Sequence, residues 1–168
     1  KDGYILDIRS NPGGLLTNAI IISDMFLDKG VIVSTVDRDG YKDTQRAQKG
    51  VLTSKPVVVL IDEGSASASE ILSGALKDND RAVLVGKKTF GKGLVQEINE
   101  LPGGAGLNMT TQKYLTPNGT DINKVGISPD VPVVNTANDY KKNHDAQLEK
   151  AQSVLEELIS QSNENIAD

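Results

Sequence analysis

Three serines are crowded into residues 63–70 (EGSASASE), between an apolar run and a predicted helix. A hydroxyl at a strand-to-helix turn lies near the backbone N–H groups that open the helix, and these groups can stabilise a developing oxyanion. The turn would therefore suit a nucleophilic serine. The alternative is structural, because Ser67 and Glu70 also have the spacing of a capping box.

A serine nucleophile needs a base, and few candidates are present. The chain has no cysteine and one histidine, His144, which we interpret as a solvated residue at a helix start because its surroundings are polar. Lys92 is flanked by glycines and precedes an apolar strand, so a dry pocket could let its amine act as a general base. Gln96 falls on the same face and could orient that amine. Alternatively, both side chains are simply solvated.

A rival motif overlaps this lysine. Residues 86–93 (GKKTFGKG) follow a predicted strand and match a phosphate-binding P-loop at every position except the last. There Gly93 stands in place of the Ser or Thr that binds magnesium. The residues that follow, LVQEI, favour a strand, whereas a P-loop opens a helix. Nucleotide binding is therefore disfavoured.

The composition is typical of one folded globular domain. Of the 168 residues, 38% are hydrophobic and 24% are charged, which is too apolar for a disordered chain. The net charge of -5 lacks the basic footprint that phosphate backbones require, so we expect no nucleic acid partner. Without cysteine there are no disulfides or thiolate metal sites, and we expect no cofactor and no metal. No apolar run approaches the roughly 18 residues of a membrane span.

The elements that must position the serine and the lysine follow from periodicity and turn residues. Residues 4–9 (YILDIR) predict a strand, and residues 15–27 predict a helix that is apolar around most of its circumference. The polar composition of residues 41–48 suggests a strand at a sheet edge. The β-branched run 56–61 is typical of a strand covered on both faces.

A second helix should follow the serine-rich turn, with one face on the sheet and the other in water. Further strands are predicted at residues 31–36, 82–85, 94–98, 107–113 and 131–134, and a helix near the C-terminus. This order predicts an α/β fold with a mixed sheet, flanking helices and a C-terminal helix. The turns at residues 11–14 and 64–67 follow strands, where open α/β sheets bind ligands.

Taken together and in this order, four segments resemble the C-terminal processing (tail-specific) proteases of peptidase family S41. They are ILDIRSNPGG, LIDEGSASASEILSGAL, VGKKTFGKGLVQ and KYLTPNGTDINKVGISPDV. The resemblance suggests that residues 1–134 are a partial serine peptidase catalytic core and that residues 135–168 are a C-terminal helical segment. It implies a ClpP/crotonase-like fold, truncated at its N-terminal side, with an upstream PDZ domain in the same parent chain.

The resemblance further implies a serine endopeptidase that cleaves proteins near their C-termini through a Ser/Lys dyad and an acyl-enzyme. Ser67 would be the nucleophile, Lys92 the general base and Gln96 the residue that orients the lysine. The backbone N–H groups of Gly13 and Ala68 would form the oxyanion hole, with Gly14 a less favoured neighbour of Gly13.

The partners that the resemblance implies are proteins or peptides with exposed C-termini, and it leaves a homo-oligomer open. It places the protein outside the cytoplasm, in the periplasm or cell envelope. An alternative function is that of a catalytically inactive peptide-binding or assembly module derived from the same fold.

Overall fold

The computed structural model describes the backbone of residues 1–167 and the side chains of residues 1–164. The strands form two four-stranded sheets. The parallel sheet has the order β1-β4-β5-β8, with β1 (Tyr4–Asp7), β4 (Val57–Ile61), β5 (Val83–Gly86) and β8 (Val131–Pro132). The antiparallel sheet has the order β3-β2-β7-β6, with β2 (Val31–Asp37), β3 (Lys42–Arg46), β6 (Leu94–Leu101) and β7 (Ala105–Leu115).

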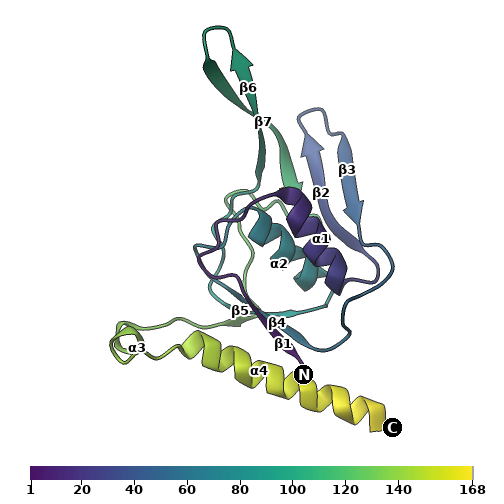
Figure 1. The fold of residues 1–168 in the computed structure, drawn as a ribbon, viewed down its shortest axis with the longest axis vertical. Coiled ribbons are helices and arrows are strands. Elements are labelled where there is room, and N and C mark those ends of the chain that lie inside the picture. Colours follow the sequence, from purple (N-terminus) through teal and green to yellow (C-terminus); the bar gives the residue numbers. More distant parts are fainter. Residues whose placement is uncertain (168) are drawn as a thin grey trace.

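Helices cover both faces of the parallel sheet (Figure 1). On one face lie α1 (Leu16–Phe26) and α2 (Ala68–Asp78), and on the other lies α4 (Ala146–Ala167), preceded by the short α3 (Ala137–Lys141). The predicted α/β class with flanking helices and a C-terminal helix is confirmed. The parallel and antiparallel strands fall into two sheets because the β2–β3 and β6–β7 hairpins pair with each other through β2 and β7.

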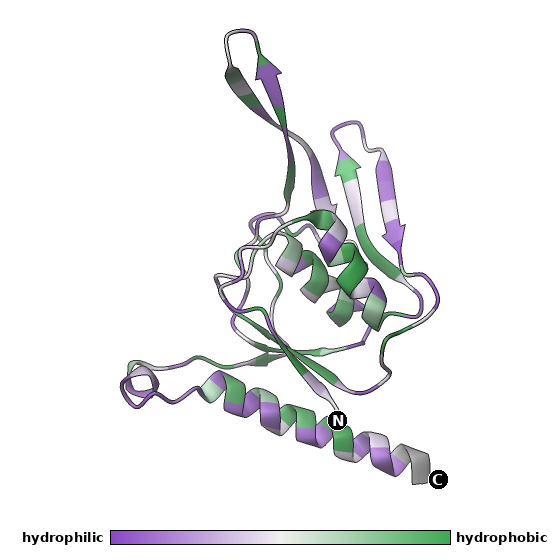
Figure 2. Ribbon diagram, in the orientation of Figure 1, coloured by the Kyte–Doolittle hydropathy of each residue, from purple (hydrophilic) through white to green (hydrophobic). Residues whose placement is uncertain are grey.

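The strongest local signals in the sequence correspond to observed strands. Every residue of β4 is buried, as its continuous β-branched run predicts for a strand covered on both faces. The polar β3 lies at an edge of its sheet, also as predicted, and Figure 2 shows the contrast between it and the hydrophobic α1.

The prediction for α2 is wrong in one respect. The helix was expected to expose a wet face, yet all of its residues from Ala68 to Leu76 are buried. The reason is tertiary, because α1 packs on α2 and the segment carrying Thr116 and Ile127 closes against Gly74. A polar side chain within α2 must therefore find its hydrogen-bond partners inside the protein.

A second hydrophobic cluster joins α4 to the outer face of the parallel sheet. Val58 and Leu60 of β4 and Val85 of β5 pack there against Ala151 and Val154 of α4. The predicted boundary between residues 1–134 and 135–168 falls between β8 and α3 and stays a prediction. Among the helices of residues 1–167, none combines the length and apolarity needed to cross a membrane.

Candidate active site

Parallel pairing of β1 with β4 brings two turns to the same sheet edge. The carbonyl oxygen of Asn11 accepts hydrogen bonds from the Ala66 N–H (3.0 Å) and the Ser69 hydroxyl (3.1 Å). Asp62 holds the other end of the first turn, because it accepts from the Ser10 N–H (2.7 Å) and the Ser10 hydroxyl (3.1 Å). The glycine turn and the serine turn therefore form one hydrogen-bonded unit.

The carboxylate of Asp62 is well suited to this role. Burial by itself would raise its pKa, but the N–H groups of Ser10 and Gly64 and the hydroxyls of Ser10 and Ser65 hold the pKa below its usual 3.8. The group thus stays ionised at neutral pH and accepts every hydrogen bond offered to it.

Ser67 stands immediately before α2 in a conformation that few side chains adopt. Its φ is 56°, in the left-handed region, which is strained for a residue with a Cβ. Ser67 and Glu70 have the arrangement of a capping box, in which the Ser67 N–H donates to the Glu70 carboxylate (2.9 Å), and the Glu70 N–H donates to the Ser67 carbonyl oxygen (2.8 Å). A strained strand-to-helix turn of this kind is what the predicted nucleophile role of Ser67 would require.

Gly13 lies directly against this turn. Its φ is 93°, and a Cβ there would stand 2.5 Å from the Ala66 carbonyl oxygen, 2.8 Å from the Ala68 nitrogen and 2.9 Å from the Ser67 Cβ. Only glycine allows this approach. The structure therefore brings together Gly13 and Ala68, the two predicted oxyanion donors. The Gly13 N–H donates to the Asn11 side-chain oxygen (2.9 Å), which a substrate oxygen would have to share or replace.

Glu70 is the functional residue that sequence reasoning missed. It is fully buried, and its Oε2 accepts from the backbone N–H groups of Ser67 (2.9 Å) and Lys92 (2.8 Å). Its Oε1 accepts from the Thr89 hydroxyl (2.6 Å) and the Gly91 N–H (2.7 Å). One carboxylate thus fixes the backbones of the predicted nucleophile and the predicted base to each other. The available signal was the capping-box spacing, which indicates only a helix start.

The loop that carries Lys92 is held at several further points. The Phe90 N–H donates to the Ser65 carbonyl oxygen (3.0 Å), and the Lys124 N–H donates to the Gly91 carbonyl oxygen (2.8 Å). The Lys92 side chain is nevertheless exposed, so the predicted dry pocket is not formed by the described residues. Within that part of the chain, no hydrogen bond joins the Lys92 amine to the Ser67 hydroxyl.

Gln96 lies on β6, in the hairpin that extends away from the body of the molecule (Figure 1). A register shift between Val95 and Gln96 interrupts the strand alternation that the prediction assumed. The Gln96 amide donates to the Thr110 hydroxyl (3.4 Å) and accepts from the Asn108 amide (3.3 Å) rather than contacting Lys92. Its orienting role stays a prediction.

The P-loop interpretation fails at the start of β6. The strand β6 begins at Leu94, directly after Gly93, where a phosphate-binding loop would open a helix. In residues 1–167 no group of three or more His, Asp or Glu side chains is arranged to hold a metal ion.

A mainly apolar cavity of about 240 Å³ adjoins the two predicted oxyanion donors. Gly13 and Ala68 line it on one side, and its polar lining residues carry no charge. Its apolar walls come from β1 and the residue that follows it, from α1 and from α2, and include Leu6, Ile8, Ala19, Ile22 and Leu72. The cavity is thus adjacent to the place where the two predicted donors would bind an oxyanion.

This chain is similar to known proteins over most of its length. The model of Peptidase family S41 matches residues 1–133. The carboxyl-terminal-processing protease of Synechocystis sp. is 55% identical over 129 residues, which are 77% of this chain and 30% of that protein. The carboxy-terminal-processing protease of Bartonella bacilliformis is 50% identical over 149 residues, 87% of this chain and 34% of that protein.

Among solved structures, the photosystem II D1 C-terminal processing protease superimposes with a TM-score of 0.76 at 44% identity, over 79% of this chain and 34% of that one. The chain thus spans about a third of the length of these relatives.

Proposed function

The chain belongs to peptidase family S41, and from this we propose that the full-length protein is a serine endopeptidase that cleaves proteins near their C-termini. The observation that carries the proposal is the sharing of Glu70 Oε2 by the N–H groups of Ser67 and Lys92. It fixes the nucleophile turn and the lysine loop side by side, although they are distant in sequence.

In the proposed reaction, the Ser67 hydroxyl attacks the scissile carbonyl carbon while the Lys92 amine accepts its proton. The oxyanion that forms takes hydrogen bonds from the Gly13 and Ala68 N–H groups. Collapse of the tetrahedral intermediate breaks the peptide bond, and the leaving amine takes the proton from Lys92. Water, activated by the same amine, then hydrolyses the ester on Ser67 and restores the hydroxyl.

Two further features bear on this reaction. The step requires the exposed Lys92 side chain to turn toward Ser67, and its flexible four-carbon stem permits such a rotation. The cavity beside Gly13 and Ala68 is mainly apolar, so it suits an apolar side chain at the residue whose carbonyl is attacked. A charged side chain there would lose its hydration without finding a partner.

Other parts of the proposal rest on the resemblance to the family. They are an upstream PDZ domain that selects substrates by their C-termini, and a location in the periplasm or cell envelope. Gln96 would orient Lys92 once the amine has turned toward Ser67. The inactive peptide-binding module remains the competing function, and the exposure of Lys92 in this chain is the observation that favours it.

Two substitutions in the full-length protein test the proposal. Ser67→Ala and Lys92→Arg should each abolish peptide cleavage, because the first removes the nucleophile and the second leaves a guanidinium that cannot accept a proton. Labelling by a fluorophosphonate should occur on Ser67 alone. Lys88→Arg is the matched control, since Lys88 is another exposed lysine of the same loop, and this variant should keep parental activity.

Undiminished cleavage by Ser67→Ala would overturn the mechanism. An intact parent that neither cleaves peptides nor reacts with the fluorophosphonate would instead favour the inactive module.

A further inference from the structure

Arg9 directly precedes the glycine turn, and charged and polar side chains hold its guanidinium. Asp7 accepts from Arg9 Nε (2.9 Å) and Nη2 (2.7 Å). On the opposite side, Arg9 Nη1 donates to the Asp145 carboxylate (2.8 Å) and to the Gln147 side-chain oxygen (3.1 Å). Only 17% of the Arg9 side chain is exposed. The C-terminal segment therefore contacts a residue that lies four positions before Gly13 in the sequence.

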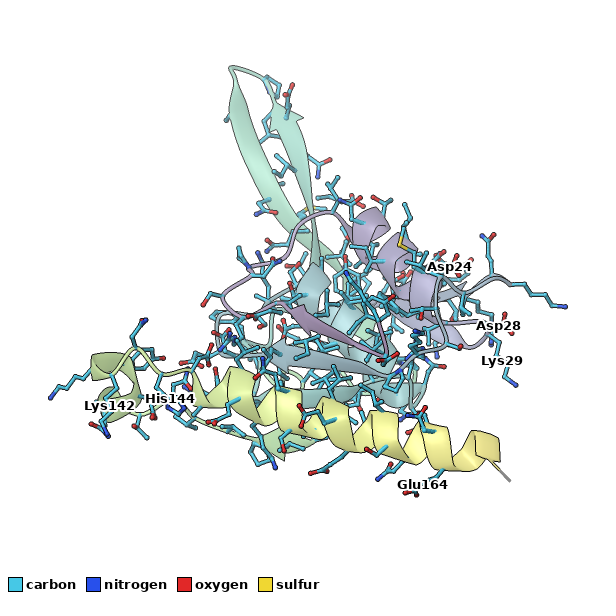
Figure 3. The ribbon with its side chains drawn as sticks, turned by 60° about the horizontal axis from the view of Figure 1, so that its bottom comes forward. Asp24, Asp28, Lys29, Lys142, His144 and Glu164 are labelled. Atoms are coloured by element: carbon cyan, nitrogen blue, oxygen red, sulfur yellow. The ribbon has the colours of Figure 1, made fainter. Side chains whose placement is uncertain are left out.

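Asp145 is the centre of this contact. The residue stands immediately before α4, at the helix end near His144 in Figure 3, and the N–H of Leu148 donates to its carboxylate (3.1 Å), as in a helix N-cap. The Asn135 amide donates to the same oxygen (3.1 Å). The hydrogen bond from Arg9 holds the pKa of Asp145 well below its usual range, so the carboxylate is ionised at neutral pH.

Arg9 is connected to the site through the backbone of the glycine turn. The next residue, Ser10, has φ 54° and is held by Asp62, and Asn11 then accepts the Ala66 N–H before the chain reaches Gly13. Asp62 thus clamps this turn from the side of the serine turn. Through Arg9, Asp145 clamps it from the side of α4.

We propose that Asp145 is a positioning residue of the site, which acts through Arg9 to hold residues 10–13, and with them the Gly13 N–H, against Ser67. The inference rests on the proposed peptidase function. Asp145 lies outside residues 1–133, the range matched by the family, so the C-terminal segment of this chain supplies the contact.

The expected kinetic consequence is specific. Without Asp145, Arg9 would keep only the Gln147 contact on the side of α4, and the more loosely held turn would leave the Gly13 donor poorly aligned with the oxyanion, which exists only in the transition state. Such a change lowers kcat and leaves KM nearly unaltered.

Asp145→Ser in the full-length protein is the decisive variant. Serine keeps a side-chain cap for α4 but is too short and lacks the charge to reach Arg9. We expect kcat to fall about tenfold, a part of the loss that follows removal of an oxyanion donor. KM should stay within about twofold and the unfolding temperature within about 3 °C of the parental values.

Asp145→Asn keeps the cap and a neutral hydrogen bond to Arg9, so its kcat should be intermediate and should restore part of the loss. Asp139→Ser is the matched control, because the Asp139 carboxylate accepts from the N–H of Thr136, the N-cap of α3, and hydrogen-bonds His144 without contacting Arg9. Its kcat should equal the parental value. In an Arg9→Gln background, Asp145→Ser should cause no further loss, since Asp145 acts through Arg9.

A parental kcat in Asp145→Ser would overturn this inference, and so would a fall in kcat that the unfolded fraction of the variant accounts for. Additive losses of kcat in the double variant would also overturn it. None of these results would affect the proposed function. A parent protein without any cleavage would refute the proposed function and the inference together.

Discussion

Replacing Glu70 by glutamine should disable the site, although it exchanges only one oxygen for one nitrogen. The donors to this carboxylate are the N–H groups of Ser67, Gly91 and Lys92 and the hydroxyl of Thr89, of which Gly91 and Thr89 are buried with it. A carboxylate accepts hydrogen bonds on both oxygens, whereas an amide offers one oxygen and one NH2 group. In Glu70→Gln, the NH2 group must therefore face two of these donors, and it cannot accept a hydrogen bond from either of them.

The size of the effect follows from this donor set. The best arrangement turns the NH2 group toward Thr89, whose hydroxyl can rotate to accept, and leaves the Gly91 N–H without a partner. One unsatisfied buried N–H costs about 1–3 kcal/mol. The remaining bonds lose their charge assistance, which roughly halves their strength. A total of about 3 kcal/mol should lower the unfolding temperature by about 6–12 °C for a domain of this size.

The cleavage rate of Glu70→Gln should fall further than the loss of folded protein alone would explain. A shift of about 1 Å between nucleophile and base can cost about a hundredfold in rate, and the bonds to Ser67 and Lys92 are those that the substitution would weaken. Thermal unfolding and peptide cleavage by the full-length protein measure both effects. Glu63→Gln is the control, because Glu63 pairs only with Lys87 at the surface, and both properties should stay near parental values. Parental kcat in Glu70→Gln would refute the reasoning.

Two further predictions concern the glycine turn and the start of α4. Gly13→Ala should abolish cleavage and lower the unfolding temperature, because the alanine Cβ would stand 2.5 Å from the Ala66 carbonyl oxygen. Gly14→Ala is the control and should be tolerated, because its Cβ would meet nothing within 4 Å. An active Gly13→Ala enzyme would contradict the site geometry. The hydrogen bonds of His144 to Asp139 and Glu149 raise its pKa above the usual 6.5, so its stabilising effect is full below pH 6.5 and is lost as the pH rises through the raised value. The difference in unfolding temperature between the parent and His144→Gln should therefore shrink toward alkaline pH, and a difference that did not change with pH would exclude this account.

Local sequence signals predicted the framework well. The strand β4 could be predicted because a strand buried on both faces is rich in β-branched residues. The strand β3 could be predicted because a strand at a sheet edge is rich in polar residues. The buried outer face of α2 could not be predicted, since its cover comes from Thr116 and Ile127, which no periodicity within the helix reveals. The short α3 gave too few residues for any periodic pattern.

Some features of the site could likewise be predicted from the sequence, and others could not. The two turns were expected at strand ends, and the resemblance to the family named Gly13 and Ala68, which the structure brings together. The role of Glu70 did not, because it exists only when a distant loop closes over the helix start and offers its N–H groups. The exposure of Lys92 and the displacement of Gln96 also depend on tertiary structure, the latter on a register shift in β6.

The pairing of β1 with β4 has a consequence for how the protein folds. Its register joins Tyr4 to Val57, so a long loop must close before the glycine turn and the serine turn can meet. Such distant contacts form slowly compared with helices and hairpins. The glycine turn and the serine turn can therefore meet only after β1 has paired with β4.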